Sequence, residues 1–274
     1  MDLGRNREAL EKKFHHLREF LQSLESVVIA YSGGVDSSFL ASVAFESLGK
    51  KALAVTAESP LFPGREIEEA QKLAREIGIL HESFPLEGLK IPEISQNLPE
   101  RCYYCKKALF KKLWSLAHAK KLNHVVDGAN YEDKDDYRPG MQAAAEMKVH
   151  SPLKKTGLTK IEIRKLSKQR GLRTWDKPSM ACLASRFPYK VTLTLDKLSQ
   201  VEKAEQFLQK KGLKQLRVRH HGKTARIEVS PQEMHFFFQK DCREEIVQTL
   251  KKLGFIYVTL DLRGYQSGTM NEML

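Results

Sequence analysis

The chain has 274 residues, of which 41% are hydrophobic and 29% are charged, a balance typical of globular proteins with a sizeable core. No apolar stretch approaches the roughly 20 residues of a membrane-spanning helix, and residues 1–19 lack the apolar segment of a signal peptide, so we expect a cytoplasmic protein without a membrane partner. The net charge of +12 favours anionic ligands such as nucleotides. Because the basic residues form scattered pairs without interleaved aromatics, this charge does not require nucleic acid as a partner.

The first half of the chain alternates short apolar strands with helical segments. The predicted strands cover residues 27–31, 52–57, 79–84 and 124–127, and the predicted helices cover 5–23, 37–48, 65–77 and 104–120. This alternation predicts an α/β fold with a parallel sheet, helices on both faces and right-handed crossovers. Ligands of such sheets bind at the carboxyl ends of the strands.

The segment after the first predicted strand is the most informative one. It reads Ser-Gly-Gly-Val-Asp-Ser-Ser over residues 32–38 and leads into a helix. Glycines let the backbone approach a ligand closely, and a helix N-terminus attracts phosphate. The segment lacks the lysine of a Walker loop, so it predicts a different cradle for ATP, with Mg²⁺ held by Asp36. The predicted binding residues are Ser32, Gly33, Gly34, Asp36, Ser37 and Ser38.

Later segments extend the site and divide the chain. The strand at 124–127 ends on Asp127, which we expect to face the same crevice. Residues 172–191 have little periodicity and contain Cys182, so we interpret them as an active-site loop. A smaller α+β unit is then predicted from helical patterns at 195–211 and after Pro231, and from strands at 215–219, 225–229 and 255–260. We therefore predict domains over residues 1–190 and 191–274.

Cysteines are the second source of chemistry in this sequence. Cys102 and Cys105 form a Cys-x-x-Cys pair, which would place both sulfurs on one face of a helix. A redox dithiol, half of a zinc site and two ligands of an iron–sulfur cluster are all compatible with this pair. Cys182 is flanked by Lys177 and Arg186, whose positive charges favour the thiolate. A lone cysteine is otherwise a small buried hydrophobic residue, and at this point both interpretations of Cys182 stay open.

Several motifs together resemble the LarE family of ATP-dependent sulfur transferases. They are residues 32–38, Asp-Asp-Tyr-Arg-Pro-Gly at 135–140, Cys-Leu-Ala-Ser-Arg-Phe-Pro-Tyr at 182–189, and the segment at 257–271. The first is similar to the PP-loop of ATP pyrophosphatases, which cleave ATP between the α and β phosphates. The resemblance implies a PP-loop fold and conversion of pyridinium-3,5-biscarboxylic acid mononucleotide to its bisthiocarboxylic form, a step in the biosynthesis of the nickel-pincer nucleotide cofactor of lactate racemase.

The same resemblance implies roles for the cysteines. Adenylation, with Asp36 in the catalytic site, turns a carboxylate oxygen into a leaving group, and a Cys182 thiolate then attacks the acyl-adenylate. In one mechanism Cys182 gives up its own sulfur and becomes dehydroalanine. With its extra pair, the chain resembles a three-cysteine subgroup in which Cys102, Cys105 and Cys182 hold a [4Fe–4S] cluster that carries the sulfide. We expect the cluster, while a sacrificial Cys182 and a structural zinc site stay open.

The phosphate of the substrate needs fixed cations. Arg217 and Arg219 alternate onto one face of a predicted strand, and arginine suits bidentate phosphate binding. The resemblance implies a substrate-binding role for both and a supporting role for Glu205, and a charged edge strand is the alternative. Lys190 stands where the family pattern has glycine, which leaves the conformation of its loop open. A homo-oligomer and a downstream nickel-insertion protein are also implied.

Two other functions fit parts of the sequence. A tRNA-thiolating enzyme also combines a PP-loop with cysteines and would use the basic surface. A nucleotide-binding assembly partner would keep the loop without cleaving ATP. Affinity for tRNA distinguishes the first alternative, and ATP-dependent release of pyrophosphate distinguishes the second.

Overall fold

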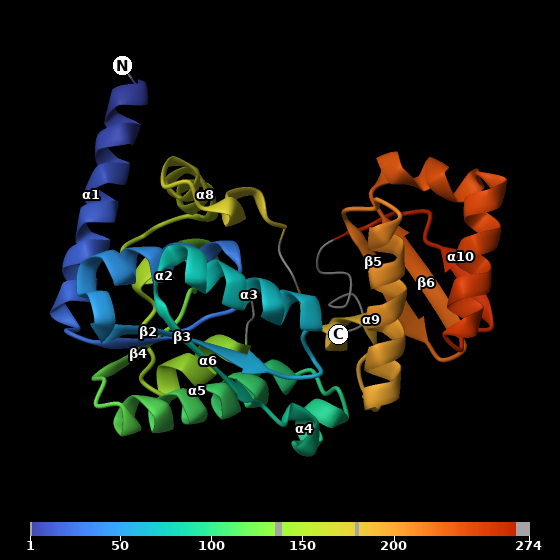
Figure 1. Cartoon of the computed structure of the whole chain (residues 1–274), viewed down its shortest axis with the longest axis horizontal. Helices are drawn as coiled ribbons and strands as arrows, with labels where there is room; N and C mark the ends of the chain where they lie inside the picture. The colour runs from blue at the N-terminus through green and yellow to red at the C-terminus, as the bar shows by residue number, and fades with distance from the viewer. Residues whose placement is uncertain (1, 135–138, 179–180, 267–274) are drawn as a thin grey trace. The chain divides into compact units, whose positions relative to one another are not determined.

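The computed structural model describes residues 2–134, 139–178 and 181–266 (Figure 1). The motifs at 135–140 and 257–271 therefore lie partly outside the described residues. The chain forms two compact units. The N-terminal unit comprises Met1–Ser59, Gly64–Glu87 and Glu100–Met180, and the C-terminal unit comprises Pro60–Pro63, Gly88–Pro99 and Ala181–Leu274. Residues 181–190, which include Cys182, thus belong to the second unit, although the predicted boundary follows them.

The N-terminal unit is built on a parallel sheet, as predicted. Its strands are β1 (Val27–Ala30), β2 (Ala52–Glu58), β3 (Leu80–Pro85) and β4 (His124–Val126), in the order β3-β2-β1-β4. Val27 of β1 lies opposite both Ala52 and His124, and every pairing in this sheet is parallel. The carboxyl end of β1 leads directly into the loop at 32–34, so the sheet presents this loop at its ligand-binding edge.

Helices cover both faces of this sheet (Figure 1). Because side chains alternate along β1, Val27 and Ile29 enter one core and Val28 enters the other. The first face packs against α1 (Asp2–Ser23), α2 (Val35–Leu48), α3 (Gly64–Ile77), α7 (Pro152–Lys155) and α8 (Lys160–Gln169). The second face packs against α5 (Arg101–Ala119) and α6 (Pro139–Glu146). Within the described part of the chain, no helix has the length and apolar character needed to cross a membrane.

The C-terminal unit is a small α+β structure, again as predicted. It contains α4 (Pro92–Ser95), α9 (Leu195–Lys210), β5 (Leu216–His221), β6 (Thr224–Val229), α10 (Lys240–Lys252) and β7 (Tyr257–Leu260). Strands β5 and β6 are antiparallel across a two-residue turn at Gly222, whereas β6 and β7 are parallel. The described residues of the aperiodic stretch at 172–191 form the short 3-10 helices η4 (Arg173–Asp176) and η5 (Leu183–Arg186). Other 3-10 helices are η1 (Gly49–Lys51), η2 (Gly88–Lys90), η3 (Tyr131–Lys134) and η6 (Pro231–Phe238).

Lys190 adopts a left-handed backbone conformation, with a φ of 65°. Its N–H donates to the carbonyl oxygen of Asn97 at 3.1 Å, and the side chain of Asn97 holds the preceding turn by donating to the carbonyl of Pro188 at 2.8 Å. Left-handed geometry disfavours any residue with a Cβ. The loop therefore keeps the conformation that glycine favours even though lysine occupies the position.

Replacing Lys190 with glycine is expected to stabilise the protein by about 1 kcal/mol, because glycine removes the left-handed strain but adds entropy to the unfolded chain. Urea unfolding of both forms measures this change. The same substitution at the exposed Lys203 of helix α9 is the control, and it should destabilise by about 1 kcal/mol. If Lys190→Gly instead lowered the free energy of unfolding, the left-handed backbone at this position would not be strained.

Several histidines make stability depend on pH. Burial lowers the pKa of His81, His150, His220 and His221. An unfolded histidine takes up a proton near pH 6.5, whereas these four take it up only at lower pH in the folded chain. Below about pH 6.5 the unfolded state therefore binds more protons, and stability falls as the pH falls.

We expect the free energy of unfolding, measured in urea, to be lower at pH 5.5 than at pH 7.5. His220 is the clearest contributor, because its ring contacts those of Phe187 and Phe255 in tilted arrangements and its Nε2 lies 3.1 Å from the Gln200 side-chain oxygen. His220→Gln should make the dependence shallower. An unchanged or rising stability over this interval would show that other groups dominate.

Candidate active site

Serine hydroxyls hold the loop between β1 and α2 in a compact shape. Ser32 Oγ lies 3.1 Å from Ser37 Oγ, and Ser38 Oγ lies 3.3 Å from the hydroxyl of Tyr31. Burial raises the pKa of Tyr31 to about 12, so this hydroxyl keeps its proton at neutral pH. Helix α2 begins at Val35, and its first N–H groups have no partner within the helix. The loop therefore has the donors that a phosphate group needs.

Gly33 and Gly34 occupy different backbone conformations within this loop. Gly33 has a φ of 68°, and a Cβ added to it would stand 2.8 Å from Cα of Ala70 in helix α3. Gly34 is extended and caps helix α2. Because a side chain at Gly33 would clash with the backbone of α3, contact with this helix fixes the loop only when glycine is present.

Asp36, in the first turn of α2, forms an ion pair with a lysine distant in the sequence. Lys160 Nζ donates to Asp36 Oδ2 at 2.5 Å, and both side chains are largely buried. The second carboxylate oxygen, Oδ1, is buried and has no hydrogen-bond partner among the described residues. Buried polar atoms normally have a partner, and an anionic oxygen beside hydroxyl groups suits a divalent cation. The residues present therefore fit Mg²⁺.

Asp127 follows strand β4 and is buried beside the same loop. Its Oδ1 accepts hydrogen bonds from Ser151 Oγ at 2.7 Å and from the N–H of Ala129 at 3.2 Å. A Cβ on the next residue, Gly128, would lie 3.1 Å from the backbone nitrogen of Ser37. The end of β4 is thus in van der Waals contact with the start of α2. Asp127 therefore lies close to the loop at 32–38, whose crevice it is predicted to face.

Lys177 connects the aperiodic stretch to the loop. Its Nζ donates to Glu66 Oε2 and Glu69 Oε2, both at 2.8 Å, and to the carbonyl of Gly33 at 3.3 Å. Arg164 of α8 donates to the carbonyl of Lys177 at 2.8 Å, which holds the backbone at this position. The positive charge of Lys177 is therefore compensated by carboxylates, and its role is to tie residue 177 to α3 and to the loop.

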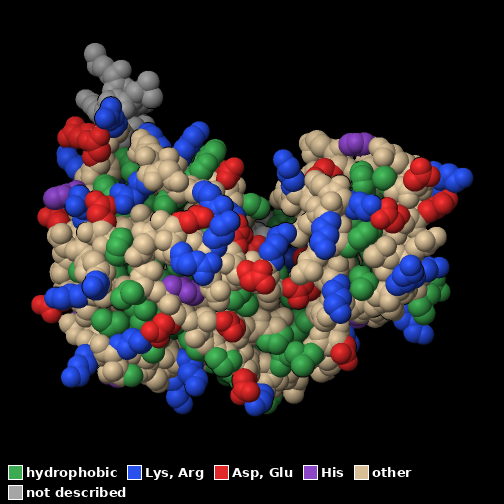
Figure 2. Space-filling model, in the orientation of Figure 1, with side chains coloured by type: hydrophobic (Ala, Val, Ile, Leu, Met, Phe, Trp, Pro, Cys, Tyr) green, Lys and Arg blue, Asp and Glu red, His purple; other side chains and the backbone are tan. Residues whose placement is uncertain are grey.

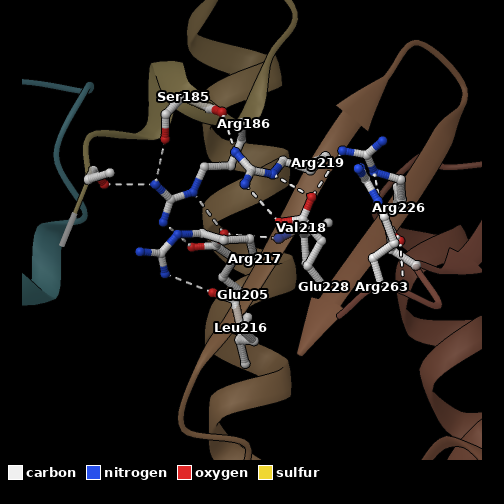
Figure 3. Close-up of polar contacts among 12 residues, drawn as sticks. Ser185, Arg186, Glu205, Leu216, Arg217, Val218, Arg219, Arg226, Glu228 and Arg263 are labelled. Atoms are coloured by element: carbon white, nitrogen blue, oxygen red, sulfur yellow. Dashed lines mark hydrogen bonds and ion pairs between the residues drawn. The ribbon is translucent and has the colours of Figure 1, made fainter. Parts of the chain in front are cut away.

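Arg186 is fully buried in the C-terminal unit and makes a bidentate ion pair with Glu205 of α9. Its Nε and Nη2 donate to the two carboxylate oxygens at 2.9 and 3.0 Å (Figure 3). Glu205 also accepts from the N–H of Val218 in β5 at 3.0 Å. The charge of Arg186, like that of Lys177, is thus paired with a carboxylate. That these two charges favour a thiolate at Cys182 stays a prediction.

Arg219 is held by Glu228 of the neighbouring strand β6. Its Nε and Nη2 donate to the Glu228 carboxylate at 2.9 and 2.7 Å, while Nη1 donates to the carbonyl of Ser185 at 2.7 Å (Figure 3). Arg226 adds a further donor to Glu228 at 2.9 Å. Glu228 therefore fixes two guanidinium groups at once.

Arg217 lies two residues before Arg219 on the same strand and is also buried. Its guanidinium lies over the ring of Tyr265, with 5.1 Å to the ring centre. Burial and the positive charge of Arg186 lower the pKa of Arg217. An anion bound here would stabilise the charged guanidinium and so offset the effects of burial and of the neighbouring positive charge. β5 is an edge strand of its sheet, yet these two charged side chains point into the unit.

Cys102 and Cys105 lie near the start of α5, in the N-terminal unit, so the pair is helical and its two residues are about one turn apart. Neither is in a disulfide. Two thiols one turn apart are suitable ligands for iron or zinc. Among the described residues there is no group of three or more histidine, cysteine or acidic side chains placed to hold a metal ion. Cys182 belongs to the C-terminal unit.

Two groups that the fold brings to these sites are not among the predicted site residues. Lys160 stands 124 residues from Asp36, and nothing in the local pattern connects them. The capping box of Thr159 and Glu162 marks the start of α8 but not the direction of Lys160. Glu228 was missed as well, although its position opposite Arg217 in the β5–β6 register was accessible once the hairpin had been predicted.

Figure 2 shows lysine and arginine side chains interspersed with acidic ones on the visible face. The positive net charge is therefore not gathered into one uniform patch on this face.

Comparison with known proteins indicates the family of this chain. A family model described as NAD synthase matches residues 9–134, which include the loop at 32–38. Glutamine-dependent NAD(+) synthetase of Thermotoga maritima is 41% identical over only 23% of this chain and 12% of its own length.

Longer matches extend along nearly the whole chain. An uncharacterized protein of Synechocystis sp. is 46% identical over 97% of this chain and 99% of its own length. Pyridinium-3,5-bisthiocarboxylic acid mononucleotide synthase of Lactiplantibacillus plantarum is 38% identical over 93% of this chain and 92% of its own length. The similarity to the second protein therefore includes both compact units.

Proposed function

Because this chain belongs to the LarE family of pyridinium-3,5-bisthiocarboxylic acid mononucleotide synthases, we propose that it adenylates the carboxylates of pyridinium-3,5-biscarboxylic acid mononucleotide and replaces the activated oxygen with sulfur. It is an ATP-dependent sulfur transferase with a PP-loop. The observation that carries the proposal is the loop at 32–38 with its Asp36–Lys160 pair, joined in one chain to a buried arginine cluster. The extended similarity favours this mononucleotide over tRNA as the acceptor of sulfur.

Activation takes place in the loop. Its N–H and hydroxyl groups bind the β and γ phosphates, and Lys160 supplies a positive charge beside them. A substrate carboxylate oxygen attacks the α phosphorus, the bond to the bridging oxygen breaks, and pyrophosphate leaves. Asp36 would hold Mg²⁺, which would neutralise charge on the leaving pyrophosphate. Asp127 orders the neighbouring backbone through the hydrogen bond to Ala129.

Substrate binding is assigned to the cluster of Arg217, Arg219 and Glu205. The two arginines bind the nucleotide phosphate, and Glu205 supports them from the centre of the cluster. Pairing of Arg219 with Glu228 fixes the guanidinium before substrate arrives, which reduces the entropy lost on binding. The lowered pKa of Arg217 supports an anion-binding role, because a bound anion would stabilise its buried positive charge.

Sulfur transfer passes through Cys182. Its thiolate attacks the acyl carbon, a carbon–sulfur bond forms, and AMP leaves with the electron pair of the carbon–oxygen bond. Loss of the Cα proton and cleavage of the cysteine Cβ–Sγ bond then release the thiocarboxylate and leave dehydroalanine with a Cα–Cβ double bond. The alternative source is a [4Fe–4S] cluster, which Cys102, Cys105 and Cys182 would hold and which would supply a bound sulfide. The thiol chemistry fits such a cluster, and we propose both sources for direct comparison.

The test uses the full chain purified without oxygen. With ATP, Mg²⁺ and the pyridinium biscarboxylate, we expect release of AMP and pyrophosphate together with the thiocarboxylate. Iron and sulfide that disappear in Cys102→Ala support the cluster, whereas loss of the mass of hydrogen sulfide from Cys182 supports the sacrificial route. Pyrophosphate release that does not depend on the pyridinium substrate would overturn the proposed function.

A homo-oligomer and a nickel-insertion protein that takes the product are further proposals. They rest on the family alone, and the described residues add no argument for either. Size measured by light scattering tests the first. Transfer of the thiocarboxylate product to a nickel-dependent acceptor tests the second.

A further inference from the structure

The peptide carbonyl of Cys182 receives three hydrogen-bond donors. They are the N–H of Ser185 at 3.0 Å, the hydroxyl of Ser185 at 2.8 Å and Nη1 of Arg186 at 3.1 Å. The first bond is the one that closes the turn of η5. The turn needs only this one donor. The hydroxyl and the guanidinium are therefore additional donors to an oxygen that has two lone pairs. They withdraw electron density from the carbonyl of the cysteine itself.

The charged member of these donors, Arg186, is fixed before any reaction begins. Arg186 is fully buried, and its other two nitrogens are bound by Glu205, as Figure 3 shows. Nη1 also contacts the carbonyl of Ala181 at 2.7 Å and the Ser185 hydroxyl at 3.0 Å. A charged donor held in place inside a protein stabilises developing negative charge far better than water does. The segment around Cys182 therefore resembles an oxyanion hole built on the protein's own backbone.

We propose that Arg186 and Ser185 promote β-elimination at Cys182 by stabilising the enolate that forms when its Cα proton leaves. The proposal rests on the proposed function, since the leaving group is the thiocarboxylate of the Cys182 thioester. The Cα–H bond breaks and its proton passes to solvent water, while the electron pair moves toward the carbonyl oxygen. That pair then forms the Cα–Cβ double bond as the Cβ–Sγ bond breaks. Sulfur leaves with the electrons of that bond, and dehydroalanine remains.

The surroundings of Cys182 suit this step. Its neighbour Ala181 is exposed and Cys182 itself is half-buried, so both residues contact water. A cysteine that acted only as a cluster ligand would use its sulfur and would gain nothing from a polarised carbonyl. The three donors therefore favour Cys182 as the sulfur donor, even in a chain that also carries Cys102 and Cys105.

The experiment measures elimination without ATP or substrate. A dibromo-diamide reagent alkylates an accessible thiol twice, and the cyclic sulfonium then loses the Cα proton to give dehydroalanine. Peptide mass spectrometry follows this conversion at Cys182 and at Cys242 of helix α10, which serves as the internal control in the same unit. After alkylation is complete at both, Cys182 should eliminate at least about tenfold faster. Equal rates would overturn the inference.

Variants assign the effect to the donors. Ser185→Ala removes one neutral donor and keeps the N–H, so elimination at Cys182 should slow about tenfold, while Ser185→Thr should restore it. Arg186→Gln should slow it further. Arg186→Gln removes a buried charge and can unfold the unit. If this variant does not fold, the comparison of Ser185→Ala with Ser185→Thr decides the outcome. A Ser185→Ala protein with an unchanged rate at Cys182 would reduce the donors to a structural role.

Failure of this inference is distinct from failure of the proposed function. The model elimination needs neither ATP nor the pyridinium compound, so it can fail while pyrophosphate release and thiocarboxylate formation proceed. The reverse also holds, because loss of substrate-dependent pyrophosphate release would leave the elimination rates unchanged.

Discussion

Glu205→Gln is expected to lower the free energy of unfolding by about 3–5 kcal/mol, the usual effect of removing one partner from a buried ion pair. The side chain of Arg186 is 0% exposed and that of Glu205 is 6% exposed, so water cannot replace the lost carboxylate. Glutamine keeps an acceptor for the N–H of Val218 but has no negative charge. Urea unfolding of the purified variant measures the change.

An exposed pair in the same unit gives a matched control. Glu245 pairs with Lys211 at 2.5 Å, and these side chains are 50% and 32% exposed. Surface pairs contribute about 0–1 kcal/mol, so Glu245→Gln should have little effect. If Glu205→Gln and Glu245→Gln were equally mild, the Arg186–Glu205 pair would not stabilise the C-terminal unit in the way its burial indicates.

Local patterns were sufficient to predict the elements that position the loop. The first two strands and helix α2 follow from short apolar runs and from Gly33-Gly34, because these signals act over a few residues. The left-handed conformation at Lys190 is the one that the expected glycine would favour. The backbone geometry of this turn is thus the same although lysine replaces glycine. Where the physical cause is local, the sequence was informative.

The contacts that give the sites their charge pattern were not predictable in the same way. Lys160 reaches Asp36 only because α8 packs beside α2, and Glu66 and Glu69 meet Lys177 only because α3 packs on the loop. The prediction that Lys177 and Arg186 favour a thiolate at Cys182 considered their charges alone, because a sequence without its fold does not show their counter-ions. Each proved to be an anchor for backbone carbonyls and carboxylates.

Units defined by packing differ from units defined by order along the chain. Pro60–Pro63 and Gly88–Pro99 lie between elements of the parallel sheet in the sequence, yet they belong to the C-terminal unit. Asn97 is the physical reason for the second segment, because its side chain donates to the carbonyls of Phe187 and Pro188. A composition shift could not reveal this connection.

Asp36→Asn is expected to reduce substrate-dependent pyrophosphate release at least about a hundredfold. The change is nearly isosteric, but it removes the negative charge that would hold Mg²⁺ and leaves the Lys160 ammonium without its counter-ion at 2.5 Å. The Oδ1 atom, which has no hydrogen-bond partner in the described part of the chain, also loses its affinity for a cation. Pyrophosphate measured across a range of Mg²⁺ concentrations separates a weaker metal interaction from a slower reaction.

Asp241→Asn provides the control, because Asp241 lies in the first turn of α10 as Asp36 lies in the first turn of α2. Both substitutions remove a charge that interacts favourably with a helix N-terminus, an effect of only about 0.3–1 kcal/mol. Asp241 is exposed and has no place in the loop, so its variant should release pyrophosphate at the unmodified rate. An Asp36→Asn protein with full activity and an unchanged Mg²⁺ dependence would mean that the reaction does not use this carboxylate, and the loop would then act through its backbone and Lys160 alone.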